Sequence, residues 1–173
     1  MDKVQKQLID TYYRKRNIGI HYYRVLEGYE IVYALLHDIK IDTNLIRTNK
    51  LAIIVAKYPE IITKLKTDIF DTSHITDMLA KEQGLELYKY FDLDRLSTRQ
   101  IVDLLYNRQE YADILDLSKL SSDNIRLLLR YRPNLITKLD LTKLDSSEIE
   151  DIVFHQPSLK PYFKGMNWVD YKK

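Results

Sequence analysis

Hydrophobic residues recur along residues 42–163 with a period of 24 residues. The segments DLSKLSSDNIRLLLRYRPNLITKL and DLTKLDSSEIEDIVFHQPSLKPYF follow one another directly and align without a gap. Three earlier segments align in the same register, one of them after allowance for two extra residues near EQGLEL. Since a fixed internal period of about 20–50 residues is typical of stacked repeat architectures, the pattern predicts five tandem repeats. The repeats span 42–65, 66–91, 92–115, 116–139 and 140–163.

Five positions of the repeat are apolar in every copy, and three of them have helical spacing. Positions 10, 13 and 14 lie on one face of an α-helix, so each repeat is predicted to contain a short helix of about ten residues. Positions 5 and 24 extend the same apolar set to either side of that helix. The residues are Ile46, Phe70, Leu96, Leu120 and Leu144 at position 5; Leu51, Ile75, Ile101, Ile125 and Ile149 at position 10; Ile54, Met78, Leu104, Leu128 and Ile152 at position 13; Val55, Leu79, Leu105, Leu129 and Val153 at position 14; and Leu65, Phe91, Leu115, Leu139 and Phe163 at position 24.

The residues before the later helices carry signals for helix N-termini. Position 6 is Ser or Asp, whose oxygen can accept a hydrogen bond from a backbone N–H of the first turn. Position 9 is Gln, Asn or Glu, which can return a bond to the cap and complete a capping box. In the first repeat Arg47 cannot cap, so Thr48 is expected to take that role. The predicted pairs are Ser97–Gln100, Ser121–Asn124 and Asp145–Glu148.

Proline at position 18 marks a second helical segment, since it suits the first turn of a helix. It occurs as Pro59, Pro133 and Pro157. Positions 18–24 are therefore interpreted as a second, very short helix, and positions 1–5 as a tight turn or 3₁₀ segment. A repeat of this size cannot bury its apolar face alone, whereas stacked neighbours can. The prediction is an all-α fold, a right-handed α-solenoid of about five repeats.

The two ends of the chain are predicted to act as caps. Residues 1–41 differ in kind from the repeats and are expected to form an N-terminal helical cap, with a first helix in 1–16 and one longer helix, or two, in 17–40. Residues 164–173 begin a sixth repeat and form a C-terminal cap, in which Trp168 plugs the last groove. The residues of the N-terminal cap expected to face the repeats are Ile20, Tyr23, Leu26, Ile31, Ala34 and Leu35.

The period and the layout resemble leucine-rich repeat variant proteins, which alternate an α-helix with a shorter 3₁₀ helix in units of the same length. The resemblance covers residues 42–163 and rests on the Leu/Ile columns and on Pro59, Pro133 and Pro157. It implies a fold of stacked helical repeats and transfers no active site.

Composition narrows the classes of function. The net charge of +2 over 173 residues gives no global case for binding to nucleic acid or membrane. The absence of Cys excludes a cysteine nucleophile and a thiolate zinc site. No apolar run approaches the roughly 20 residues of a membrane span, and a cytoplasmic location in a host or producing cell is expected. The few Gly and 14 Tyr, with abundant Ile and Lys, are typical of AT-rich genomes, including those of phages and other viruses.

Two clusters of basic residues are candidate binding sites. The first lies in YYRKRNIGIHYYR, where basic and aromatic side chains could track a phosphate backbone and stack on bases. The alternative is a solvated helix end with half-buried tyrosines. The second cluster predicts a positive patch near the third and fourth repeats, facing an acidic protein or nucleic acid. The candidate residues are Arg14, Lys15, Arg16, Tyr22, Tyr23 and Arg24 in the first cluster, and Arg108, Arg126, Arg130 and Arg132 in the second.

Local pairing is the competing interpretation of the second cluster. The fifth repeat reverses the sign of charge with Glu148, Glu150 and Asp151, so the arginines are expected to form surface ion pairs with it in preference to a ligand site. Arg108 and Arg132 occupy position 17 of adjacent repeats and are expected to lie side by side. Both hypotheses stand at this stage.

No catalytic, metal or cofactor site is predicted. His155 follows Asp151 by four residues and Glu148 by seven, a spacing that could gather metal ligands, but a surface histidine is the preferred interpretation. His74 is expected to be a capping or surface residue. No glycine-rich phosphate loop or nucleophile elbow occurs in the sequence.

We expect a non-catalytic protein–protein interaction module, of phage or viral origin; the alternative is a nucleic-acid-binding helical-repeat protein.

Overall fold

The computed structural model describes residues 28–39 and 41–165, and these residues contain α-helices and 3₁₀ helices but no strand. The predicted all-α class is confirmed. The chain divides into two compact units between Phe91 and Asp92, which is also the boundary between the predicted second and third repeats. No helix in the described part has the length and hydrophobicity needed to cross a bilayer.

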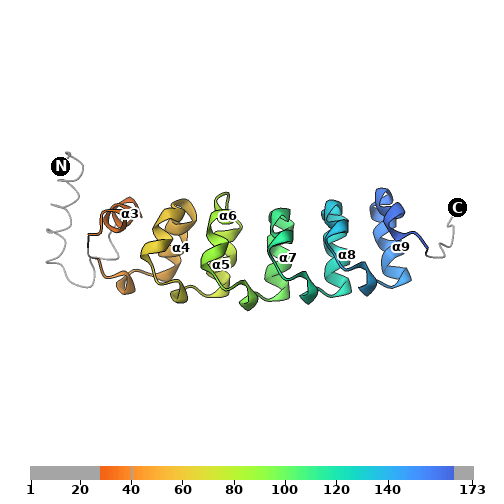
Figure 1. Ribbon diagram of the computed structural model, residues 1–173, viewed down its shortest axis with the longest axis horizontal. Coiled ribbons are helices and arrows are strands. Elements are labelled where there is room, and N and C mark those ends of the chain that lie inside the picture. Colours follow the sequence, from red (N-terminus) through yellow and green to blue (C-terminus); the bar gives the residue numbers. More distant parts are fainter. Residues whose placement is uncertain (1–27, 40, 166–173) are drawn as a thin grey trace. The chain divides into compact units, whose positions relative to one another are not determined.

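Unit 1 consists of α3 and a series of alternating α and 3₁₀ elements (Figure 1). The helix α4 packs against both α3 and α5. Of the residues predicted to face the repeats from the N-terminal cap, Ile31, Ala34 and Leu35 are buried in α3, and the others lie outside the described residues. The elements are α3 (Gly28–Leu36), η2 (Thr43–Leu45), α4 (Thr48–Lys57), η3 (Pro59–Lys64), η4 (Thr67–Ile69), α5 (Thr72–Leu79), α6 (Gly84–Leu87) and η5 (Tyr88–Tyr90).

Unit 2 repeats one order of elements three times: a 3₁₀ turn, a ten-residue α-helix and a second 3₁₀ segment. The helix α8 packs against both α7 and α9, and the three helices lie side by side in Figure 1. The predicted ten-residue helices and 3₁₀ turns are confirmed. The elements are η6 (Leu93–Arg95), α7 (Thr98–Asn107), η7 (Gln109–Asp113), η8 (Leu117–Lys119), α8 (Ser122–Tyr131), η9 (Pro133–Thr137), η10 (Leu141–Lys143), α9 (Ser146–His155) and η11 (Pro157–Phe163).

The predicted apolar columns form the cores of both units. All of their residues are buried except Leu65, Phe91 and Val153, which are half-buried. Because most side chains in these columns are withdrawn from water, the burial of apolar surface is the main stabilising term. A sixth buried column at position 20 escaped prediction. It consists of Ile61, Leu87, Tyr111, Leu135 and Leu159.

Tyr111 is the largest side chain of that column and is fully buried. Burial raises the pKa of its hydroxyl to about 12, because the phenolate would be cut off from water. Tyr111 is therefore a neutral core residue at any physiological pH.

The helix N-termini of unit 2 are capped as predicted. In α7, α8 and α9 the capping boxes Ser97–Gln100, Ser121–Asn124 and Asp145–Glu148 are all present. In unit 1, Asp71 caps α5 by accepting a hydrogen bond from the N–H of His74 at 2.9 Å.

The helix α4 lacks a side-chain cap, and the predicted role of Thr48 is wrong. Arg47 is the N-cap residue and makes no side-chain cap bond. Arginine has only donors, so it cannot accept from the first-turn N–H groups. Thr48 is already the first helical residue and does not stand at the N-cap position.

The two extra residues of the second repeat change its second half. Instead of a 3₁₀ helix that starts at a proline, this repeat has the short helix α6 followed by η5. Gly84 begins α6 and is buried so tightly that a Cβ there would lie 2.0 Å from the carbonyl oxygen of Leu79. The chain can make this close approach only because residue 84 has no side chain.

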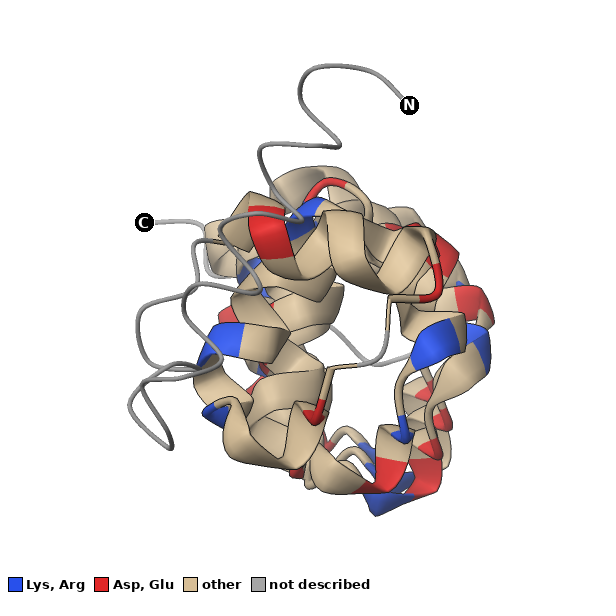
Figure 2. Cartoon of the chain, turned by 90° about the vertical axis from the view of Figure 1, so that its left-hand side faces the viewer, with Lys and Arg blue, Asp and Glu red and all other residues tan. Residues whose placement is uncertain are grey.

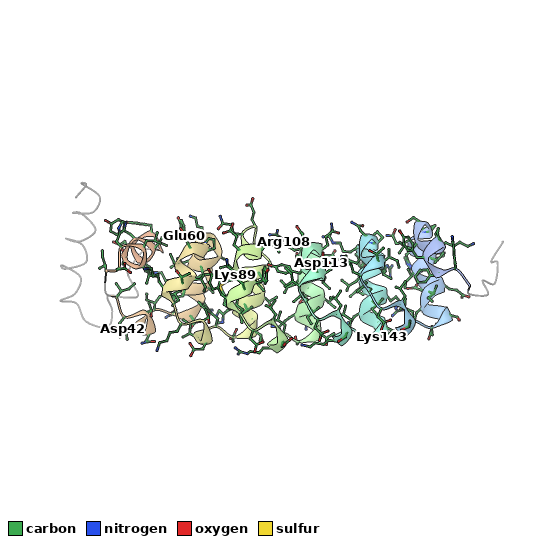
Figure 3. The ribbon with its side chains drawn as sticks, viewed as in Figure 1. Asp42, Glu60, Lys89, Arg108, Asp113 and Lys143 are labelled. Atoms are coloured by element: carbon green, nitrogen blue, oxygen red, sulfur yellow. The ribbon has the colours of Figure 1, made fainter. Side chains whose placement is uncertain are left out.

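Side chains of unit 2 join each repeat to the one before it through backbone carbonyl groups. Lys143 Nζ donates to the carbonyl oxygen of Ser118 at 2.7 Å, and Lys119 Nζ makes the equivalent bond to Asp94 at 3.0 Å. Lys143 lies at the edge of unit 2 opposite to Arg108 (Figure 3). A third bond of this kind involves Gln156, whose Nε2 donates to the carbonyl oxygen of Arg130 at 2.8 Å. These bonds span 25 or 26 residues, so they tie segments of unit 2 to the preceding segments of the same unit.

Candidate interaction surfaces

The first cluster of predicted binding residues lies outside the described part of the chain. It comprises Arg14, Lys15, Arg16, Tyr22, Tyr23 and Arg24, and Trp168 of the predicted C-terminal cap is likewise outside. Their roles stay predictions.

The second cluster lies on α8 and directly after α7 and α8. Arg126 contacts Asp123 at 2.9 Å and Asp151 of α9 at 3.8 Å. The predicted pairing of the arginines with the fifth repeat is thus confirmed for Arg126. Because both partners are at least one-third exposed to water, such a pair contributes little to stability.

The other arginines make different contacts. Arg108 lies 3.5 Å from Glu110, and Arg132 donates through Nε to the carbonyl oxygen of Tyr106 at 2.7 Å. Arg132 is thereby held beside the last turn of α7, because Tyr106 lies in that turn, two residues before Arg108. Arg130 is exposed on α8. Within the residues that the structure describes, neither Arg130 nor Arg132 forms an ion pair. Figure 2 shows basic and acidic residues interspersed over the ribbon.

Two tyrosines join these arginines in one surface, which we call the arginine–tyrosine patch. The rings of Tyr106 and Tyr131 meet edge to face with centroids 5.7 Å apart. The guanidinium of Arg132 lies 5.4 Å from the centroid of Tyr106, and that of Arg130 lies 5.8 Å from the centroid of Tyr131. Leu127, one helical turn before Tyr131, is 46% exposed and adds an aliphatic side chain. The patch consists of Tyr106, Leu127, Arg130, Tyr131 and Arg132.

Unit 1 has a concave surface, which we call the α4–α5 groove. It encloses about 570 Å³ and is lined by Ala52, Ile53 and Ala56 of α4 and Met78 of α5, among others. Ile53 is 71% exposed and also lines hollows on either side of the groove. A branched apolar side chain in this position is available to a partner.

His74 at the edge of this groove bridges two helices. Its Nδ1 lies 2.7 Å from Oδ1 of Asp71, and its Nε2 lies 2.6 Å from Oδ1 of Asn49 on α4. The backbone N–H of His74, with smaller contributions from its ring, lowers the pKa of Asp71. His74 therefore joins α5 to α4. The residue that caps α5 is Asp71, and His74 supplies the N–H that it caps.

His155 is turned toward its own helix. Its Nδ1 lies 2.8 Å from the carbonyl oxygen of Asp151 and 3.4 Å from a carboxylate oxygen of the same residue. Glu148 instead accepts a hydrogen bond from the N–H of Asp145 at 2.9 Å. Within the described ranges, no group of three or more His, Cys, Asp or Glu is placed to hold a metal ion.

The outward apolar residues escaped the sequence analysis. Ile53 and Leu127 occupy position 12, where the other repeats have aspartate, and Tyr106 and Phe154 occupy position 15. These positions lie opposite the buried face of each helix, so the outward apolar residues could have been found from the register. Phe154, at 81% exposed, is the extreme case in unit 2.

No protein-family model matches the chain, and neither the curated proteins nor the solved structures include a significant match to it.

Proposed function

We propose that this chain is a non-catalytic α-solenoid that binds another protein through the outward faces of its helices. The proposed architecture is a right-handed stack of five repeats with an N-terminal helical cap, similar in layout to leucine-rich repeat variant proteins. In support, equivalent columns are buried in both units, and in unit 2 the same side-chain-to-carbonyl bonds recur from one repeat to the next. Solenoids of this kind present extended surfaces that suit protein ligands.

One observation carries the proposal: large apolar side chains are exposed on helices whose inner faces are already packed. Ile53 and Leu127 point outward from α4 and α8, where the core gains nothing from them. Leu127 lies with Tyr106 and Tyr131 in one exposed patch of unit 2, and patches of this kind mark interaction sites in soluble proteins. The composition suits a phage or viral protein that acts on a host or virion component in the cytoplasm.

Position 12 supplies a test that leaves the fold intact. Aspartate occurs there naturally as Asp77, Asp103 and Asp151. Ile53→Asp and Leu127→Asp therefore place an accepted residue at an exposed site, and we expect the melting temperature to change little.

The test is affinity capture with cross-linking from the native producing or host cell, after nuclease treatment. We expect the wild-type chain to retain a defined protein and at least one of the two aspartate variants to lose it. Retention of no protein, or equal retention by wild type and by the double variant, would contradict the proposed function.

Nucleic-acid binding is the second candidate, favoured by the exposed Tyr131 ring beside Arg130 and by the basic segment at 12–24. A nucleic-acid binder should be retained on heparin, with a binding constant that falls steeply with salt. Joint substitution of Arg14, Lys15 and Arg16 should then abolish retention if that segment is the site. Unchanged retention removes those three residues from consideration.

A further inference from the structure

The arginine–tyrosine patch combines an excess of positive charge with exposed apolar surface. Three acidic residues near the patch are engaged with other arginines: Glu110 contacts Arg108, and both Asp123 and Asp151 contact Arg126. Arg130 and Arg132 are therefore left without a carboxylate partner among the described residues. A complementary ligand must bring negative charge to this place.

The same patch offers a well-ordered apolar contact. Leu127 and Tyr131 lie one turn apart on α8, and Tyr131 is braced by the edge-to-face contact with Tyr106. The Nε bond of Arg132 to the Tyr106 carbonyl holds this guanidinium in position before any ligand arrives. Tyrosine and arginine are among the residue types that contribute most to binding at protein interfaces. Tyrosine adds a large contact area at little cost in entropy, and arginine adds a charged group that can form two hydrogen bonds to a carboxylate.

We propose that the arginine–tyrosine patch binds a short protein segment in which a large apolar side chain is flanked by carboxylates. The apolar side chain packs against Leu127 and Tyr131, and a carboxylate accepts hydrogen bonds from Arg130. This inference rests on the proposed function and names the chemistry of the partner at one surface.

A nucleic acid fits this surface less well than an acidic peptide. Asp103, in the middle of α7, and Asp123, in the first turn of α8, are both exposed. A phosphate backbone that followed either helix would pass these carboxylates, whereas a peptide needs to place only one or two charges near Arg130. In addition, Arg132 and Arg130 already lie over the rings of Tyr106 and Tyr131, which limits stacking by bases.

The experiment selects ligands from a displayed library of random 12-residue peptides with the full-length chain as bait. The variants are Arg130→Glu and, as a matched control with the same change in charge, Arg99→Glu on the first turn of α7. Both side chains are exposed, so circular dichroism should show the wild-type helix content for both variants. A single-stranded 20-residue oligothymidylate serves as the nucleic-acid probe.

We expect the selected peptides to contain Asp or Glu on either side of Phe, Leu or Trp. Measured by fluorescence anisotropy, these peptides should bind the wild-type chain and Arg99→Glu with equal affinity. They should bind Arg130→Glu at least about tenfold more weakly, because a charge-assisted hydrogen bond is lost and a negative charge is placed beside the peptide carboxylates. Tyr131→Ser should weaken binding to a similar extent.

Three results would each overturn the inference: selection of no peptide, selection of peptides without acidic residues, or equal binding by wild type and Arg130→Glu. Oligothymidylate binding that is lost in Arg130→Glu, without peptide binding, would assign the patch to nucleic acid instead. Failure of the proposed function is distinguishable, because then the full chain captures no protein at all. If only this inference is wrong, Arg130→Glu still captures the same protein from the cell as the wild-type chain does.

Discussion

The helices of the two units are alike on their inner faces and different on their outer faces. At position 10, Ile75 of unit 1 and Ile125 of unit 2 are equally buried. At position 15, unit 1 has Ala56 and Ala80, whereas unit 2 has Tyr106, Arg130 and Phe154. In unit 1, Ala56 lines the groove beside Ile53, and in unit 2, Tyr106 and Arg130 belong to the arginine–tyrosine patch. Packing between neighbouring helices constrains the inner positions, so the outer positions are where the helices can differ.

The inner faces should respond equally to truncation. Ile75→Ala and Ile125→Ala each remove a side chain that is 1% exposed, and each should lower the free energy of unfolding by about 2–5 kcal/mol. Urea unfolding of the full chain measures the loss. The control is Leu127→Ala, whose exposed side chain should cost less than about 1 kcal/mol. A loss below about 1 kcal/mol at either isoleucine would break the equivalence of the two units.

A local feature of unit 1 should be sensitive to a single added methyl group. Gly84→Ala places a Cβ against the backbone of Leu79, which cannot move aside as a side chain tip can, and should destabilise the chain by about 1–3 kcal/mol. Gly28→Ala is the control, because its Cβ would meet Ile54 at an ordinary 3.5 Å. Thermal unfolding distinguishes them. Equal melting temperatures for the two variants would show that α6 can shift without cost.

The difference in capping between α4 and α8 can be tested by removing the cap of α8 and by adding a cap to α4. Ser121→Ala removes a capping box from α8 and should cost about 1 kcal/mol. Arg47→Ser supplies the acceptor that α4 lacks and should stabilise the chain by about 0.5–1 kcal/mol. Thr48→Ala should change stability by less than either. Chemical denaturation gives all three values, and a Thr48→Ala loss as large as that of Ser121→Ala would restore Thr48 as the cap.

The smallest expected effect is a dependence of stability on acidic pH. The Ser118 hydroxyl and N–H lower the pKa of Asp116 from 3.8, and those of Thr142 do the same for Asp140. Because each carboxyl is more acidic in the folded chain than in the unfolded one, its stabilisation is complete above pH 3.8 and disappears as the pH falls through the lower folded value.

The measurement is the melting temperature as a function of pH. It should be level just above pH 4 and decline below 3.8, and the decline should be shallower in Asp116→Asn with Asp140→Asn. An identical decline in this double variant would show that these two turns do not contribute.

Several structural details could be predicted because they depend on one helix at a time. The spacing of Ile101, Leu104 and Leu105 identifies a buried face whatever lies opposite. The capping box of Ser97 and Gln100 is likewise local. Two predictions failed where the local signals were weak. The start of α4 is predicted one residue too late, because Thr48 is interpreted as the N-cap residue in place of Arg47. The buried column at position 20 was missed because two extra residues before Leu87 shift it out of alignment.

The sequence alone determined the all-α class, the helix length and the inner faces, because the spacing of apolar residues can be read from each helix by itself. Only the tertiary structure decided which outward residues meet. Tyr106 and Tyr131 are 25 residues apart and come together because α8 packs beside α7 on the side where position 15 of one repeat faces position 16 of the next. A linear pattern does not state on which side the next helix packs, so the arginine–tyrosine patch became visible only when the helices were placed in space.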